Sequence, residues 1–251
     1  MSKKIVLHIG LHRTGTSSFQ ATMDEHREEF LAAGIDPFII APNRPHAREI
    51  GFACVRSGVF ERPWDEKATV QLKDQIAEFL RGSEMDRLLF STEHLSFIRT
   101  TAEIEQLKSL FPNEDVEFKI IVVLREKEEW FRSYKDQILK AMDYKPGGQS
   151  SWKNVNDDSW VRDHEQMIQL FRDSFDDVQV IGYDRTDMTG KMLGILGIKP
   201  NFNTRAYRRN KRSMRFGRTV HLIIRKLFGS EGHGPIKAIS KARENFLMNR
   251  R

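Results

Sequence analysis

Cysteine is almost absent from this sequence, which has only Cys54 in 251 residues. A single thiol excludes an intramolecular disulfide and any metal site built from several cysteines. Long apolar runs are also missing, since the longest, residues 120–124, is far shorter than the roughly 20 residues that span a bilayer. The first residues lack the long apolar region of a signal peptide. We therefore expect a cytoplasmic protein without a membrane span, in which Cys54 is a small buried residue.

Acidic residues are scarce at one end of the chain. From Arg205 onward, fourteen Lys and Arg face only two Glu, a net charge of +12, whereas residues 1–204 carry −6. Such a segment can bind a phosphate-rich cofactor or an anionic glycan, and it can equally be the solvated face of a docking helix. Aromatic residues between the cations are few, so we expect no nucleic-acid partner.

The pattern along residues 1–200 alternates between short β-branched runs and longer stretches of helical periodicity. This alternation predicts a three-layer α/β sandwich with a central parallel sheet, like that of P-loop NTPases. The expected strands are residues 5–9, 37–40, 88–91, 119–124 and 178–183. The expected helices are residues 16–32, 65–81, 102–111, 127–142, 160–175 and 188–196. Residues 201–251 are expected to form a basic helical segment packed on this core.

Two long connections, residues 41–64 and 143–157, interrupt the alternation. In open α/β sheets such excursions often cover the functional site, because loops carry function while the sheet supplies a rigid frame. We expect the pocket for an acceptor substrate to be built from these two segments.

The loop between the first strand and the first helix predicts an anion site. Its two glycines, Gly10 and Gly15, allow unusual backbone dihedrals and bring N–H groups together, while the following helix directs its positive dipole end at the loop. The loop also contains hydroxyl groups and a guanidinium group. The candidate binding residues are His12, Arg13, Thr14, Gly15, Thr16, Ser17 and Ser18.

One residue type is missing from this loop. A P-loop that hydrolyses nucleotides has Lys directly after the second glycine, whereas this chain has Thr16 there. The substitution argues against a P-loop nucleotide kinase that uses ATP and Mg²⁺, which stays the alternative enzyme. A non-catalytic polyanion-binding protein is the alternative outside the enzymes.

The residues from Arg13 to Ser17, Arg-Thr-Gly-Thr-Ser, resemble the loop of sulfotransferases that depend on PAPS (3′-phosphoadenosine 5′-phosphosulfate), particularly the small bacterial and carbohydrate-modifying branch. The resemblance implies that the loop grips the 5′-phosphosulfate. It also implies that Arg13, where the family more often has Lys, contacts the departing sulfuryl group.

A second motif extends the resemblance. Arg125 closes an apolar strand and Ser133 follows eight residues later, directly before Tyr134, which is similar to the 3′-phosphate motif of the same family. A guanidinium group and a hydroxyl group that bind this phosphate would select PAPS from nucleotides that lack it. The resemblance covers the chain from Lys4 to about Tyr183.

Sulfuryl transfer requires a base for the proton of the acceptor. Two candidates end the third expected strand: Glu93, which the resemblance favours by its position, and His94, whose ordinary pKa lies near neutrality. His8 is expected to pack between sheet and helix. No side-chain cluster has metal-ligand spacing, so we expect no metal. The sequence thus predicts transfer of a sulfuryl group from PAPS to a hydroxyl or amine of a small-molecule or glycan acceptor.

Overall fold

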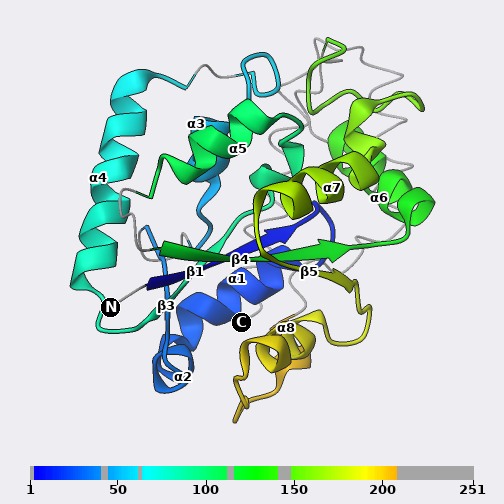
Figure 1. Cartoon of the computed structure of the whole chain (residues 1–251). Helices are drawn as coiled ribbons and strands as arrows, with labels where there is room; N and C mark the ends of the chain where they lie inside the picture. Colours follow the sequence, from blue (N-terminus) through cyan, green and yellow to red (C-terminus); the bar gives the residue numbers. More distant parts are fainter. Residues whose placement is uncertain (1–2, 41–44, 62–63, 112–115, 141–147, 208–251) are drawn as a thin grey trace, which may run out of the picture. The chain divides into compact units, whose positions relative to one another are not determined.

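The computed structural model describes residues 3–40, 45–61, 64–111, 116–140 and 148–207. Within these residues five parallel strands form one sheet in the order β2-β3-β1-β4-β5 (Figure 1). The strands are β1 (Lys3–Gly10), β2 (Ile35–Pro37), β3 (Arg87–Ser91), β4 (Val116–Leu124) and β5 (Asp177–Gly182). The expected α/β class with a central parallel sheet is confirmed.

Helices cover both faces of this sheet (Figure 1). One face carries α3 (Arg48–Cys54), α4 (Glu66–Gly82), α5 (Thr101–Lys108), α6 (Lys127–Lys140) and α7 (His164–Ser174). The other carries α1 (Thr16–Glu25), α2 (Arg27–Ala32) and α8 (Met188–Leu196). Three short 3₁₀ turns complete the described elements: η1 (His94–Phe97), η2 (Trp160–Arg162) and η3 (Thr204–Tyr207).

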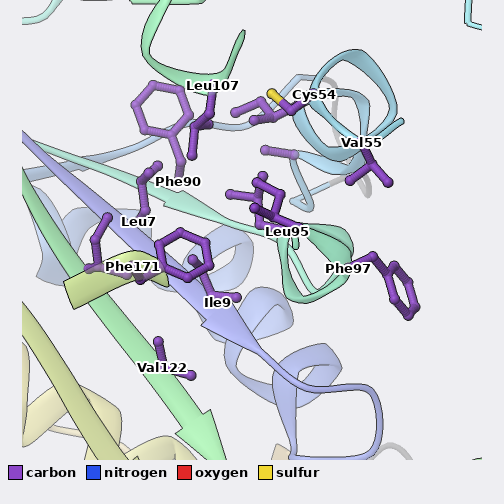
Figure 2. Close-up of a cluster of buried hydrophobic side chains, with 14 of the residues drawn as sticks. Leu7, Ile9, Cys54, Val55, Phe90, Leu95, Phe97, Leu107, Val122 and Phe171 are labelled. Carbon is purple, nitrogen blue, oxygen red and sulfur yellow. The ribbon is translucent and has the colours of Figure 1, made fainter. Parts of the chain in front are cut away.

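Successive residues of the central strands pack on opposite faces, as the pleat of a strand requires. Leu7 and Ile9 of β1 enter the larger cluster, which Figure 2 shows together with Phe90, Val122 and Phe171. Their neighbours in sequence, such as Val6 and Ile121, instead pack against α1, α2 and α8. Burial of both faces explains why the strands read as continuous apolar runs.

Cys54 lies in the larger cluster, in the last turn of α3 (Figure 2). Burial raises the pKa of its thiol far above the ordinary value, since the thiolate would lose its hydration. This confirms that Cys54 is a small buried residue.

The strand order creates a switch point beside β1. From β1 the chain runs through α1 and α2 to β2 on one side of the sheet, whereas from β4 it runs to β5 on the other side. In open α/β sheets ligands bind outside the carboxyl ends of the strands at such a point. The ends of β1 and β4 meet there, with Gly10 opposite Val123.

Several element boundaries differ from the expected ones. The second strand is Ile35–Pro37 instead of residues 37–40, since it begins at the buried Ile35. The N–H of Phe38 still donates to Leu89 O of β3 at 2.8 Å, and its ring packs against those of Phe79 and Phe90. The expected helix 16–32 is divided at His26, whose ring stacks on Phe202. The expected helix 160–175 begins as η2 and continues as α7 only after Asp163, which caps it.

The first long connection contains α3, a helix that periodicity did not predict because its seven residues make barely two turns. Of the expected basic segment 201–251, the structure describes residues 201–207, with η3, and the remainder lies outside the described residues. The segment's packing and the domain boundary near residue 200 therefore stay predictions.

Gly51 offers a test of how α3 is held against η1. A Cβ atom at Gly51 would lie 2.2 Å from the Cβ of His94 and 3.1 Å from its backbone. We expect Gly51→Ala to lower the free energy of unfolding by about 1–3 kcal/mol, because the two segments must separate to admit a methyl group. Urea unfolding at neutral pH measures the change.

The matched control is Gly194→Ala in α8, where an added Cβ meets nothing within 4 Å. This substitution should leave the protein unchanged or stabilise it by up to about 1 kcal/mol, since alanine favours a helix over glycine. Equal effects of the two substitutions would contradict the close packing of α3 on His94.

Candidate active site

The loop from β1 to α1 lies at the switch point and has a strained backbone. Arg13 and Gly15 both adopt the left-handed conformation, with φ of 70° and 83°. A positive φ is costly for arginine, and such outliers concentrate at functional sites where the surrounding structure maintains them. Here the loop is held by Leu11, whose N–H donates to the carbonyl of Val123 in β4 at 3.3 Å.

The first turn of α1 presents its N–H groups without competition from a side chain. Its N-cap is Gly15, which has no side chain to accept from the helix, and the first turn contains no acidic residue. The N–H of Ser18 donates to Gly15 O at 3.0 Å, and the N–H groups before it, together with the helix dipole, favour an anion at this end. The loop therefore has the geometry of an anion site.

The hydroxyl groups of the loop divide into inner and outer ones. Thr14 and Thr16 are buried with their Oγ1 atoms 3.5 Å apart, and the Thr14 hydroxyl donates to Leu11 O at 2.6 Å. Thr16 folds back over Gly10, where a Cβ would lie only 2.2 Å from its Oγ1. Ser17 is exposed and Ser18 is half-buried in the first turn of α1.

The two expected phosphate motifs come together in the fold. The Nε of Arg13 donates to Ser133 Oγ in α6 at 3.1 Å, and the Nη1 of Arg125 donates to the carbonyl of Arg13 at 3.4 Å. Arg125 is largely buried and its Nε atom has no partner among the described residues. A buried guanidinium with an unpaired donor matches a site for an anion.

Arg125 is surrounded by further charged and aromatic groups at the ends of β4 and β5. Its guanidinium lies 5.2 Å from the ring centroid of Tyr183, and it pairs with Glu129 in the next turn of α6. Glu129 also pairs with Arg185 from the loop after β5. Arg13, Arg125 and Arg185 therefore bring positive charge to the segments that follow β1, β4 and β5.

His12 directs its ring away from the anion loop. The ring is buried beside Phe97, Tyr134, His94 and Trp152, at centroid distances of 5.4–5.8 Å. Its backbone carbonyl accepts a 2.7 Å hydrogen bond from the indole of Trp130 in α6. His12 thus braces the loop through its backbone and contributes its side chain to an aromatic cluster.

The two base candidates have different surroundings. Glu93 is half-buried, and its Oε2 accepts from Gln20 Nε2 in α1 at 3.2 Å. Gln20 also contacts the carbonyl and hydroxyl oxygens of Ser91 at 3.4 and 3.3 Å. The carboxylate at the end of β3 is therefore tied to the helix that follows the anion loop.

His94 lies among aromatic rings. Its centroid is 4.9 Å from that of Phe52 and 5.3 Å from that of Phe60, and its Nδ1 has no partner among the described residues. Burial, and secondarily the neighbouring His12, lower its pKa to about 3. The imidazole is therefore neutral at physiological pH and a weak base.

The two long connections meet beside these histidines. The N–H of Trp152 donates to Val59 O at 3.1 Å, and Lys153 pairs with Glu61 at 2.7 Å. A cleft of about 710 Å³ has Phe52, Phe60 and Trp64 in its lining. Among the described residues the cleft is lined by the first connection, α4 and α5 and not by the second connection, so the expectation that both connections build an acceptor pocket stays a prediction.

Sequence reasoning missed several residues of this region. Gln20, Glu129 and Arg185 carry no motif, since a polar residue on a helix or loop is most often solvated. Their roles depend on contacts between segments far apart in the chain. Among the described residues no group of three His, Cys, Asp or Glu could hold a metal. None of the helices formed by the described residues is long and apolar enough to cross a bilayer.

Comparison with known proteins identifies the family. A family model described as a sulfotransferase domain matches residues 5–193, which is most of the chain. The chain therefore belongs to the sulfotransferase domain family. Comparison with curated proteins gives no significant match.

Among solved structures, the chain is similar to a gluconokinase from Sinorhizobium meliloti 1021. The identity is 13%, the match covers 78% of this chain and 92% of the kinase, and the TM-score is 0.33. A likeness of this degree carries no argument about the activity of the chain.

The buried histidines predict a pH-dependent stability. Burial lowers the pKa of His8 to about 3 and that of His12 to about 4, against 6.5 in the unfolded chain. Below pH 6.5 the unfolded chain therefore binds more protons than the folded one. The free energy of unfolding should fall with pH from 6.5 toward 4, by up to about 1.4 kcal/mol per pH unit for each such histidine.

Urea unfolding between pH 7 and pH 4.5 measures this slope. His8→Asn keeps a polar partner for Ser91, whose Oγ lies 2.8 Å from His8 Nδ1, and removes one titrating group. The variant should show a shallower slope than the wild type. An unchanged slope would contradict the neutral buried state of His8.

Proposed function

We propose that this chain is a PAPS-dependent sulfotransferase that transfers the sulfuryl group to a hydroxyl or amine of a small-molecule or glycan acceptor. The single observation that carries the proposal is the contact of Arg13 with both Ser133 and Arg125. PAPS carries a 3′-phosphate and a 5′-phosphosulfate on one ribose, so its protein must hold two anion sites close together. The sulfotransferase family of the chain supports the same donor.

The residues at the switch point suit this donor. The N–H groups at the start of α1, with Thr14, Thr16, Ser17 and Ser18, would bind the 5′-phosphosulfate, and Arg125 with Ser133 would bind the 3′-phosphate. Since Arg13 donates its Nε to Ser133 Oγ, the Ser133 hydroxyl keeps its own hydrogen for a phosphate oxygen. The unpaired Nε of Arg125 is a further donor.

The reaction assigned to these residues is an in-line transfer. PAPS supplies, when bound, the sulfuryl group and a phosphate leaving group. The loop N–H groups and the Arg13 guanidinium would stabilise the negative charge that develops on the leaving oxygens, because they are oriented before the reaction begins. No metal is required for this role of the chain's own donors.

Glu93 is the better of the two base candidates. Its carboxylate is half-exposed and held by Gln20, so it can reach a bound acceptor while staying close to the donor loop. His94 is less suitable, since burial lowers its pKa to about 3 and so disfavours its protonated form. We therefore assign proton removal to Glu93 and a packing role in the acceptor region to His94.

Binding of PAP, the desulfated product, tests the donor site. We expect PAP to stabilise the wild-type protein in thermal-shift measurements. Arg125→Ala should abolish most of the shift, and Ser133→Ala should weaken PAP binding about tenfold, because each removes a charge-assisted hydrogen bond. Ser109→Ala, at an exposed serine after α5, is the matched control and should not change binding.

ATP with Mg²⁺ and heparin are the comparison ligands. Stabilisation by ATP with Mg²⁺ and not by PAP would support the kinase alternative, although Thr16 stands where that enzyme class has lysine. Stabilisation by heparin alone would support a non-catalytic polyanion-binding protein.

Turnover separates the two base candidates. With radiolabelled PAPS and a panel of glycans, lipids and phenols, Glu93→Gln should lower kcat by about 10²–10⁴-fold and leave PAP affinity unchanged. His94→Asn should lower kcat less, and Glu105→Gln, at an exposed position of α5, serves as the control. A greater loss in His94→Asn than in Glu93→Gln would assign the base to His94.

A further inference from the structure

Glu129 holds two guanidinium groups with a single oxygen atom. The Nη2 atoms of Arg125 and Arg185 both donate to its Oε1, although one arginine ends β4 and the other lies in the loop after β5. The pKa of Glu129 lies below its ordinary value, mainly because its carboxylate accepts a hydrogen bond from Arg125. The positive charges of Arg125 and Arg185 lower this pKa further. The carboxylate is therefore ionised at neutral pH.

A carboxylate oxygen that accepts from two guanidinium groups has the arrangement of a bound phosphate oxygen. One negative charge faces two positive ones, while Arg13 offers Arg125 only its neutral backbone carbonyl and donates its Nε to Ser133. The carboxylate of the nearby Glu126 accepts from the backbone N–H groups of Glu128 and Glu129 instead of from these two guanidinium groups, and it keeps its own negative charge. The two guanidinium groups thus outnumber the one carboxylate that accepts from both of them, an arrangement that suits a phosphate oxygen in its place.

We propose that Arg185 binds the 3′-phosphate of PAPS together with Arg125 and Ser133, and that Glu129 competes with this phosphate for both guanidinium groups. The inference rests on the proposed function, which assigns the 3′-phosphate to Arg125 and Ser133. It adds Arg185, a hydrogen-bond donor that follows a different strand. It also adds Glu129, a carboxylate that opposes binding of the phosphate.

Competition of this kind gives Glu129 a defined role. Arg125 and Glu129 are one helical turn apart, so the carboxylate stays within reach when a phosphate takes its donors. A phosphate of charge −2 attracts Arg125 and Arg185 more strongly than the carboxylate of Glu129 does. To bind, however, it must displace the ion pairs that both arginines form with Glu129. Glu129 would therefore lower the affinity for PAPS and speed the release of PAP by re-forming its pairs.

Comparison of PAP with adenosine 5′-monophosphate tests the proposal, because the second ligand lacks the 3′-phosphate. Isothermal titration at low ionic strength should show PAP binding weakened about tenfold or more in Arg185→Ala, with binding of the monophosphate unchanged. Glu129→Gln should tighten PAP binding about three- to tenfold and also leave the monophosphate unchanged.

The neighbouring ion pair on α6 provides matched controls. Glu128 pairs with Arg162 at the same end of the helix, and neither residue contacts the cluster of Arg125 and Arg185. Glu128→Gln changes the charge of the helix by the same amount as Glu129→Gln, and Arg162→Ala removes an arginine from a comparable pair. Neither control should alter the preference for PAP.

The outcomes distinguish this inference from the proposed function. A wild-type protein with no preference for PAP over the monophosphate contradicts both. A wild-type preference that Arg185→Ala retains in full overturns the assignment of Arg185 and leaves the proposed function standing. Weaker PAP binding in Glu129→Gln would mean that Glu129 positions Arg125 for the phosphate, which overturns the competition.

Discussion

Parallel pairing of β1 with β4 is the constraint on which the candidate site depends. It aligns Gly10 with Val123, so the loop after β1 and the arginine after β4 leave the sheet side by side. The hydrogen bond from Arg125 to the Arg13 carbonyl then joins residues 112 positions apart. Because strands of a buried parallel sheet cannot slip without exposing their apolar faces, this juxtaposition is built into the core.

Electrostatics divides the site into two unlike halves. Around the donor loop the protein gathers guanidinium groups and helix N–H groups, which suit phosphate and sulfate oxygens. Beyond His12 the side chains are aromatic rings and buried imidazoles, whose lowered pKa values keep them neutral.

Periodicity and turn chemistry predicted most of the fold. The α/β class and the positions of four strands followed from alternating apolar runs, and α8 was predicted with its bounds and with Gly197 as its left-handed end. The errors lie where tertiary contacts override local pattern. The second strand begins at the buried Ile35, before the expected position, and the expected first helix ends at His26, whose ring stacks on Phe202.

The sequence by itself determined the positions of the loop between β1 and α1, of the arginine at the end of β4 with the serine of α6, and of the strand end that precedes Glu93. These features depend on the spacing of residues in the sequence. In a strand, a tight turn or a helix this spacing fixes where each residue lies. Only the tertiary structure brought Arg185 and Arg125 to one oxygen of Glu129. It also joined Gln20 to Glu93 by a hydrogen bond and placed His94 among aromatic rings. Such contacts arise from the crossing of segments in the folded sheet, and no local pattern encodes them because each partner alone looks like an ordinary polar residue.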